Sequence, residues 1–340
     1  MARLTFIDAD APGYTRHKIA EKARPGGSRA SVANIWEYRD DKGEIVRSRA
    51  IINRLNRIAL PPAYHDAWFA RDPNAHIQAT GIDEKGRKQY RYHADFVVQR
   101  TESKYAACAE FGKALPKVRA QVEIDLARRD LSRERVVAAI IRLLDLGSVR
   151  IGNESYAKAN SSFGATTLRE HHAKVRGTKL MLNYVGKSGK VHELSIADAR
   201  LARVVRRCQD LPGGNLFQFV GDDGAVHAVS STDVNDCLRR HAGEFTAKDF
   251  RTWSASVIAF DYLANTPDKP SLKAMLERVS RQLGNTPAIA RKSYVHPAMI
   301  DAVQAGREVK RPLPRATRYL SRAERGLLAH LDALASNSEA

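Results

Sequence analysis

Residues 179–196 read Lys179-Leu-Met-Leu-Asn-Tyr-Val-Gly-Lys-Ser-Gly-Lys-Val-His-Glu-Leu-Ser-Ile196. Two strand-like runs, 179–185 and 190–196, flank the segment Gly-Lys-Ser-Gly, which is typical of a tight turn. The pattern predicts an antiparallel β-hairpin with Lys187 at its tip. The neighbouring segments have the spacing of apolar residues that is typical of helices, so we expect this small sheet to lie within a mainly helical domain.

Helical patterns lie on both sides of the hairpin. Residues 96–146 have helical spacing, and they include a core helix with Ser132 as its N-cap and Gly147 as its stop. After the hairpin the pattern is mostly helical over residues 197–300. Within it we expect Ser271 to cap a helix that ends at Gly284, and Thr286, followed by Pro287, to cap the next one. We therefore expect a larger, mainly α-helical domain with a small antiparallel hairpin over residues 93–335.

Residues 1–92 carry the pattern of a small unit with strands and one helix. Short strands are predicted at 35–38 and 44–47, and a helix at 51–58 that ends before two prolines. A further strand follows at 87–93. The fold class that we predict is thus α+β, with a small N-terminal domain that contains a β-sheet and precedes the helical domain.

The last strand of this first unit has no apolar face. Such a strand either binds a ligand or lies solvated at the edge of a sheet, and both readings stay open. Alternation places on one face Arg87, Gln89 and Arg91, and on the other Lys88, Tyr90 and Tyr92.

The charge of the chain is strongly positive. Its 340 residues include 56 Lys and Arg against 38 Asp and Glu, which gives a net charge of +18 at pH 7. A surface of this sign attracts polyanions such as nucleic acid or an anionic membrane. The excess is divided as +6 over residues 1–92 and +12 over residues 93–340. We therefore expect both domains to face one polyanion.

Several classes of protein are disfavoured by what the sequence lacks. No run of about 18 apolar residues is present, as a membrane-spanning helix needs. Asp8, Asp10 and Pro12 stand where a signal peptide has its apolar core, so we expect a cytoplasmic, nucleoid-associated protein. The three widely spaced cysteines make neither a disulfide framework nor a zinc cluster. There is also no phosphate loop, GxGxxG, HExxH or GxSxG motif, so we expect no cofactor and no dedicated metal site.

Arg, Lys and Tyr remain as the residue types in marked local contexts, and together they suit reaction at a phosphodiester. A guanidinium matches phosphate oxygens, an ammonium can protonate a leaving oxygen, and a phenol can be a covalent nucleophile. Five segments carry these residues in order. They are Ser148–Tyr156 with Asn160–Leu168, Tyr184–Lys187, Lys248–Trp253, Leu283–Pro287 and Ser293–Pro297.

In this order and spacing the segments resemble the type IB DNA topoisomerases, in particular their bacterial, poxvirus-like branch. The resemblance covers about residues 12–315, including the N-terminal segments His76–Gly81 and Lys88–Tyr92. It implies relaxation of supercoiled duplex DNA by transient cleavage of one strand, without ATP or a metal ion. It also implies a monomer that closes around DNA as a clamp.

The resemblance makes residues 93–335 the catalytic domain and carries a role to each catalytic position. Tyr294 matches the nucleophile that forms a 3′-phosphotyrosyl link, and Arg150 and Arg251 match the two arginines that clamp the scissile phosphate. For Arg150, a structural ion pair is the alternative. Lys187 matches the lysine that protonates the leaving 5′-oxygen. Lys190 on the same hairpin is the alternative acid, or a contact to a backbone phosphate.

Asn285 departs from the broader family, which usually has a histidine at this position. An asparagine amide can still donate a hydrogen bond to a phosphate oxygen, but it cannot relay a proton. Tyr156 matches a position that touches DNA near the cleavage site, with packing beneath Arg150 as its alternative. The residues expected to contact DNA are Gln78, Gln89, Tyr90, Arg91, Tyr92, Tyr156 and Lys190.

Two other functions remain open on the sequence. A tyrosine recombinase or integrase uses the same Arg-Lys-Arg-Tyr chemistry, but it typically has His-x-x-Arg at the second arginine. Here that segment is Lys248-Asp-Phe-Arg251, which favours the topoisomerase. A non-catalytic, basic DNA-binding protein would fit the composition alone.

Overall fold

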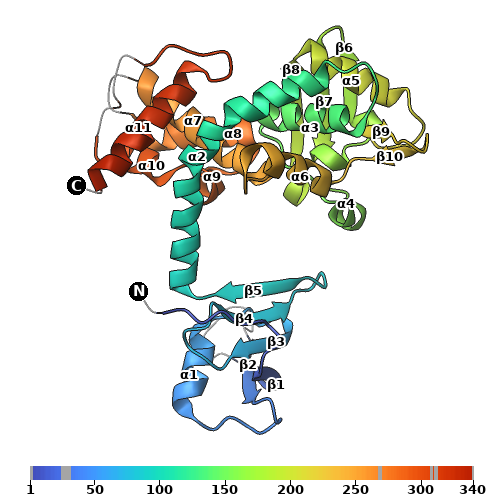
Figure 1. Ribbon diagram of the computed structural model, residues 1–340. Helices are drawn as coiled ribbons and strands as arrows, with labels where there is room; N and C mark the ends of the chain where they lie inside the picture. The colour runs from blue at the N-terminus through green and yellow to red at the C-terminus, as the bar shows by residue number, and fades with distance from the viewer. Residues whose placement is uncertain (1–2, 24–31, 267–269, 307–308, 310–312, 339–340) are drawn as a thin grey trace. The chain divides into compact units, whose positions relative to one another are not determined.

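The computed structural model divides the chain into two compact units, Met1–Lys104 and Tyr105–Ala340 (Figure 1). The sequence predicts the boundary at residue 92, whereas this division falls within helix α2 (Ala94–Leu126). Each unit has a buried hydrophobic cluster of its own. The residues that the structure describes are 3–23, 32–266, 270–306, 309 and 313–338.

The first unit is built on an antiparallel sheet, with the strand order β2-β1-β3-β4-β5 among the described residues. Its core includes Tyr38 and Phe69, whose rings meet edge to face at 5.5 Å, and Leu55 from helix α1. The predicted strand at 44–47 is wrong, because only an isolated bridge from Ile45 is formed there. The elements are β1 (Gly13–Ala23), β2 (Val32–Arg39), α1 (Arg49–Arg57), β3 (His65–Ala70), β4 (Ile77–Ile82) and β5 (Lys88–Tyr92).

The second unit is mainly helical, with small antiparallel sheets, so the predicted α+β class is confirmed. No described helix has the length and apolarity that crossing a bilayer requires. The elements after α2 are α3 (Arg133–Gly147), α4 (Glu154–Asn160), β6 (Ala173–Arg176), β7 (Lys179–Val185), β8 (Val191–Ala197), α5 (Ala199–Gln209), β9 (Gln218–Val220), β10 (Val226–Ala228), α6 (Ser231–Ala242), α7 (Ala247–Asn265), α8 (Leu272–Leu283), α9 (Pro287–Ser293), α10 (Pro297–Gln304) and α11 (Arg322–Ser338).

The predicted hairpin is confirmed as β7 and β8, to which β6 adds a third strand on the outer edge of β7. The strands pair in register from Lys179 opposite Ala197 to Val185 opposite Val191. A single 3-10 turn, Lys187–Gly189, connects them. This register directs alternate side chains of both strands into the core, and the tip projects from it.

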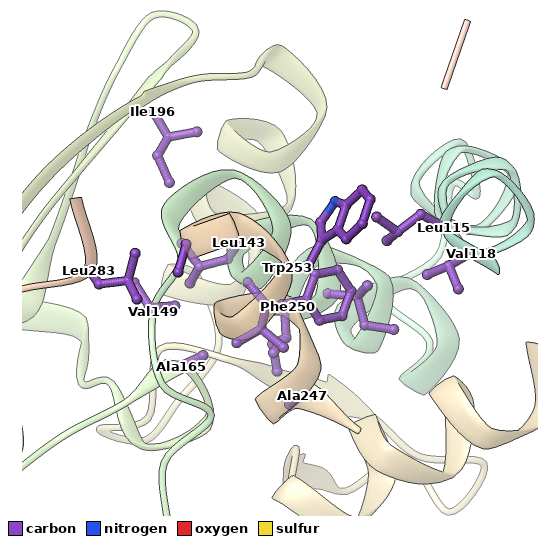
Figure 2. Close-up of a cluster of buried hydrophobic side chains, with 14 of the residues drawn as sticks. Leu115, Val118, Leu143, Val149, Ala165, Ile196, Ala247, Phe250, Trp253 and Leu283 are labelled. Atoms are coloured by element: carbon purple, nitrogen blue, oxygen red, sulfur yellow. The ribbon is translucent and has the colours of Figure 1, made fainter. Parts of the chain in front are cut away.

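Helices α3 and α7 form the centre of the second core. Figure 2 shows Phe250 and Trp253 of α7 in this buried cluster, with Leu143 of α3 on one side and Leu115 of α2 on the other. A Cβ atom at Gly112 would lie 2.3 Å from the Trp253 ring. Only glycine therefore lets α2 approach the indole this closely.

A buried ionic network attaches α11 to this core. Arg119 of α2 forms ion pairs with Asp145 at 2.8 Å and with Glu324 at 2.7 Å. The Trp253 indole also donates to Glu324, at 3.1 Å. Burial would raise the pKa of Glu324, but hydrogen bonds and the charge of Arg119 outweigh it and hold this pKa below its usual value.

We expect the Glu324→Ala variant to be strongly destabilised. It would leave the Arg119 guanidinium buried with one carboxylate fewer, and breaking a buried pair costs about 3–5 kcal/mol. Urea unfolding measures the loss. The matched control is Arg318→Ala, which removes an ion pair made by a side chain that is 73% exposed and should cost at most about 1 kcal/mol. Equal losses in the two variants would contradict the prediction.

The Glu324 carboxyl also makes the difference in stability between wild type and Glu324→Ala depend on pH. Because its folded-state pKa is depressed, Glu324 contributes stability above its unfolded-state pKa and loses that contribution as the pH falls through the folded value. The gap in unfolding free energy between wild type and Glu324→Ala should therefore narrow in acid.

Candidate active site

Local signals in the sequence place Tyr294 at the end of a short helix. Helix α8 stops at Gly284, which adopts a left-handed conformation with φ of +61°. Thr286 then caps α9 by accepting a hydrogen bond from the Ile289 amide, and Pro287 occupies the first turn. The predicted caps of both helices are confirmed. Tyr294 is the C-terminal cap residue of α9.

Arg251 on α7 lies against the ring of Tyr294. Its Cζ atom is 4.7 Å from the ring centroid, and the residue is only 3% exposed. The guanidinium donates to the main-chain oxygens of Ser148 and Leu283, the latter at 3.1 Å. These carbonyls fix the position of a charged group that would otherwise have several rotamers.

Arg150 reaches the same phenol from a second direction. It follows α3, which ends at Ser148 in a left-handed conformation with φ of 51°. The Arg150 carbonyl accepts a hydrogen bond from the Ala165 amide at 2.8 Å, which holds this loop in place. Arg150 and Arg251 both hydrogen bond to the Tyr294 side chain. The structure therefore brings together three of the predicted catalytic residues.

The two arginines change the acidity of Tyr294. Burial alone would raise the pKa of its phenol, but the charges of Arg251 and Arg150 and their hydrogen bonds outweigh this effect. The pKa of Tyr294 is therefore below its usual value. The arginines thus stabilise the phenolate, which is the nucleophilic form of the side chain.

Asn285 presents a buried amide without a partner. The residue is 7% exposed, and among the described residues neither its Nδ2 nor its Oδ1 atom has a hydrogen-bond partner. It stands two residues after Leu283, whose carbonyl binds Arg251. A buried amide left unpaired is costly, so such a group points to a ligand. An anionic oxygen bound there would accept from Nδ2.

The two lysines of the hairpin differ in their surroundings. Lys187 is exposed at the tip, and no hydrogen bond or ion pair within the described residues joins it to Tyr294 or to the arginines. The Nζ atom of Lys190 donates to the main-chain oxygen of Asn285, at 3.1 Å. The choice of Lys187 as the acid therefore stays a prediction.

Two of the predicted DNA contacts in the first unit form an exposed aromatic pair. The rings of Tyr90 and Tyr92 on β5 stack with centroids 5.9 Å apart, and they are 42% and 37% exposed. Lys88 lies over the Tyr90 ring at 5.9 Å, and the Tyr92 ring also contacts Phe96 at 5.3 Å. Arg91 points to the other side of the strand, where it donates to the Ala59 carbonyl at 3.3 Å.

The two glutamines predicted to contact DNA are already bonded within the unit. Gln78 is buried, and its amide nitrogen donates to the carbonyls of Pro73 and Ala75. Gln89 donates to the Asp83 carboxylate at 2.9 Å. The side-chain nitrogens of both glutamines therefore already have partners within the protein.

In the second unit, the main-chain amide of Tyr156 donates to the Asn153 side chain that caps α4, and the Tyr156 side chain is half-buried.

Tyr184 and His192 also belong to this site, although the sequence did not mark them as functional. Their rings stack at 5.1 Å with an angle of 10° between the planes. Burial raises the pKa of Tyr184 to about 12. Burial, together with Arg150 and Arg251, lowers the pKa of His192 to about 4. Alternation along the predicted hairpin could have placed both on its buried face.

Comparisons with known proteins show the family to which the chain belongs. Residues 86–310 match the family of the eukaryotic DNA topoisomerase I catalytic core, and residues 35–83 match the bacterial DNA topoisomerase IB N-terminal domain. A DNA topoisomerase 1B of Acanthamoeba polyphaga mimivirus is 32% identical, over 77% of this chain and 82% of the relative. The chain belongs to the type IB DNA topoisomerases.

More distant similarities extend to poxviruses and to one class of solved structure. The DNA topoisomerase 1B of Vaccinia virus is 21% identical to this topoisomerase, over 71% of this chain and 76% of the relative. A structure of the XerH site-specific recombinase bound to a palindromic difH substrate aligns with a TM-score of 0.37 and 13% identity. That alignment covers 58% of this chain and 50% of the recombinase.

Proposed function

We propose that this topoisomerase relaxes supercoiled DNA by cutting and rejoining one strand, with Tyr294 as the nucleophile. The observation that carries the proposal is a phenol held by the guanidinium groups of Arg150 and Arg251, with its pKa below the usual value. Arginine side chains match phosphate oxygens in geometry and charge. A phosphodiester bound between them would present its phosphorus to the Tyr294 oxygen.

The first step exchanges one ester for another. The Tyr294 oxygen forms a bond to phosphorus, its phenolic proton passes to solvent, and the bond from phosphorus to the 5′-oxygen breaks. Arg150 and Arg251 neutralise the charge that builds on the nonbridging oxygens, and the Asn285 amide donates to one of them. The Lys187 ammonium gives its proton to the departing 5′-oxygen.

The second step reverses the first after the DNA has swivelled. The free 5′-hydroxyl returns its proton to Lys187 and attacks phosphorus, the bond from phosphorus to the Tyr294 oxygen breaks, and the released phenolate takes a proton from solvent. The bond energy is conserved in the phosphotyrosyl link, so no nucleotide triphosphate is needed. Because cationic side chains supply the charge stabilisation, we expect activity in the presence of a chelator.

Most of the positive charge serves to hold the duplex. We propose that both units bind phosphates as a clamp on one DNA molecule, and that the enzyme acts as a monomer. The exposed pair Tyr90 and Tyr92 would contribute contacts from the first unit. Binding that rests on phosphates releases counterions, so affinity should fall steeply with salt.

The test is relaxation of negatively supercoiled plasmid in EDTA without ATP, followed by a detergent quench. We expect relaxed topoisomers and a covalent protein–DNA adduct. DNA binding with neither product would indicate a non-catalytic DNA-binding protein. Strand exchange restricted to a specific site would indicate a recombinase.

Replacing the buried amide of Asn285 should slow cleavage without destabilising the protein. Loss of one donor to a charged transition state costs about 10²–10³-fold in rate. The free protein should not lose stability in Asn285→Ala, because the amide has no partner to lose. Single-turnover cleavage and thermal unfolding measure the two effects. Asn183→Ala, at an exposed position of β7, is the control and should change neither. A destabilised Asn285→Ala variant with normal cleavage would contradict this assignment.

A further inference from the structure

His192 lies between the two segments that precede Lys187 and Asn285. A Cβ atom at Gly186 would lie 2.6 Å from Cδ2 of the His192 ring, and one at Gly284 would lie 2.2 Å from its Cε1. Both distances are shorter than any van der Waals contact allows. The imidazole therefore fills the space between the base of the hairpin tip and the turn from α8 to α9.

A third contact, with the ring of Tyr184, fixes the orientation of the His192 ring. His192 pairs directly with Tyr184 across β7 and β8, and the two rings stack at 5.1 Å. His192 is 9% exposed. Cross-strand ring pairs of this kind hold the register of a hairpin. The position of the tip thus depends on the same ring that touches the turn.

Burial and the surrounding cations keep the His192 ring neutral. It faces Arg150 from the loop after α3, Arg251 from α7 and Lys190 from its own hairpin. Glu193 of β8 and Glu277 of α8 line the neighbouring cavity of about 450 Å³, and one edge of the buried His192 ring also lines it. Burial is the largest cause of its lowered pKa, and the three cations add to it. A neutral ring adds no positive charge to a site that already holds several cations.

We propose that His192 is a positioning residue for DNA cleavage: its ring spaces the hairpin tip from the α8–α9 turn and so directs Lys187 to the leaving oxygen. The inference rests on the proposed function, in which Lys187 is the acid. His192 itself touches neither the phosphate nor the leaving group. It acts through the main chain at Gly186 and Gly284.

The first test separates a misplaced acid from a general loss of structure. His192→Ala is assayed in single-turnover cleavage of an ordinary DNA strand and of one with a 5′-bridging thiolate leaving group, which needs no proton. Misplacement of a catalytic group can cost about 10²-fold. We expect about that loss on the ordinary strand and a smaller loss on the thiolate strand, because only the ordinary strand needs Lys187, whereas both need the turn at Gly284 that carries Asn285.

The second test uses the contact itself. The backbone of Gly186 has a φ of −98°, which alanine adopts freely, so only the His192 ring opposes Gly186→Ala. We expect this variant to cleave slowly and the double variant Gly186→Ala/His192→Ala to cleave faster than Gly186→Ala alone. Gly214→Ala is the control, since nothing lies within 4 Å of its added Cβ.

The outcomes separate this inference from the function on which it rests. A wild-type protein that forms no adduct on either strand would overturn both. If the wild type forms adducts, equal losses of His192→Ala on the two strands would overturn the inference alone. So would a double variant no faster than Gly186→Ala. Thermal unfolding of each variant establishes that the compared proteins are folded.

Discussion

The Tyr294→Phe variant should bind DNA as the wild type does and form no covalent adduct with it. The change removes one oxygen atom from a ring that otherwise keeps its contact with Arg251. Arg150 and Arg251 remain to hold the phosphate, so binding survives. Removal of a covalent nucleophile lowers the rate by about 10⁶-fold. Detergent-quenched cleavage of a labelled strand measures it.

Tyr184→Phe is the matched control for this experiment. Tyr184 also lies near both arginines, but burial raises its pKa to about 12, whereas the pKa of Tyr294 is lowered. Tyr184 therefore stays protonated where Tyr294 becomes nucleophilic. The phenylalanine keeps the ring that stacks on His192. An adduct that persists in Tyr294→Phe and disappears in Tyr184→Phe would exchange the two assignments.

Local signals were sufficient for the elements that carry the site. The turn glycines predicted the β7–β8 hairpin, and the sequence around Gly284 and Thr286 predicted the end of α8 and the start of α9. Both depend on backbone conformations that few residues adopt, so one sequence reveals them. The wrong strand at 44–47 lacked such a constraint, because a polar turn beside an alternating run fits a loop equally well.

The convergence of the site could not be predicted, because it depends on contacts between distant segments. Arg251 is fixed by the carbonyl of Ser148, which is 103 residues away, and by that of Leu283. Both acceptors are main-chain oxygens, and the type of residue that carries them does not reveal this contact. The resemblance to a family supplied the residue identities, but it did not mark His192, whose importance lies in how closely two glycines approach its ring.

Lys187→Ala should slow cleavage of ordinary DNA by about 10²–10⁴-fold, the range that general acid catalysis contributes. The expectation follows from its place at the exposed tip of the hairpin, where its ammonium is free to reach a bound leaving oxygen. A strand with a 5′-bridging thiolate should restore most of the rate, since a thiolate departs without a proton. Single-turnover rates on both strands measure the effect.

Lys190→Ala decides between the two lysines of the hairpin. Its ammonium is committed to the main-chain oxygen of Asn285, so it supports the turn that carries the amide. Its removal should weaken stabilisation of the phosphate, which both strands need, and should slow them to the same extent. Selective rescue of Lys190→Ala by the thiolate, with equal losses in Lys187→Ala, would make Lys190 the acid. The two lysines are thus distinguished by the ratio of the cleavage rates on the thiolate and the ordinary strand, which does not depend on how strongly either variant is impaired overall.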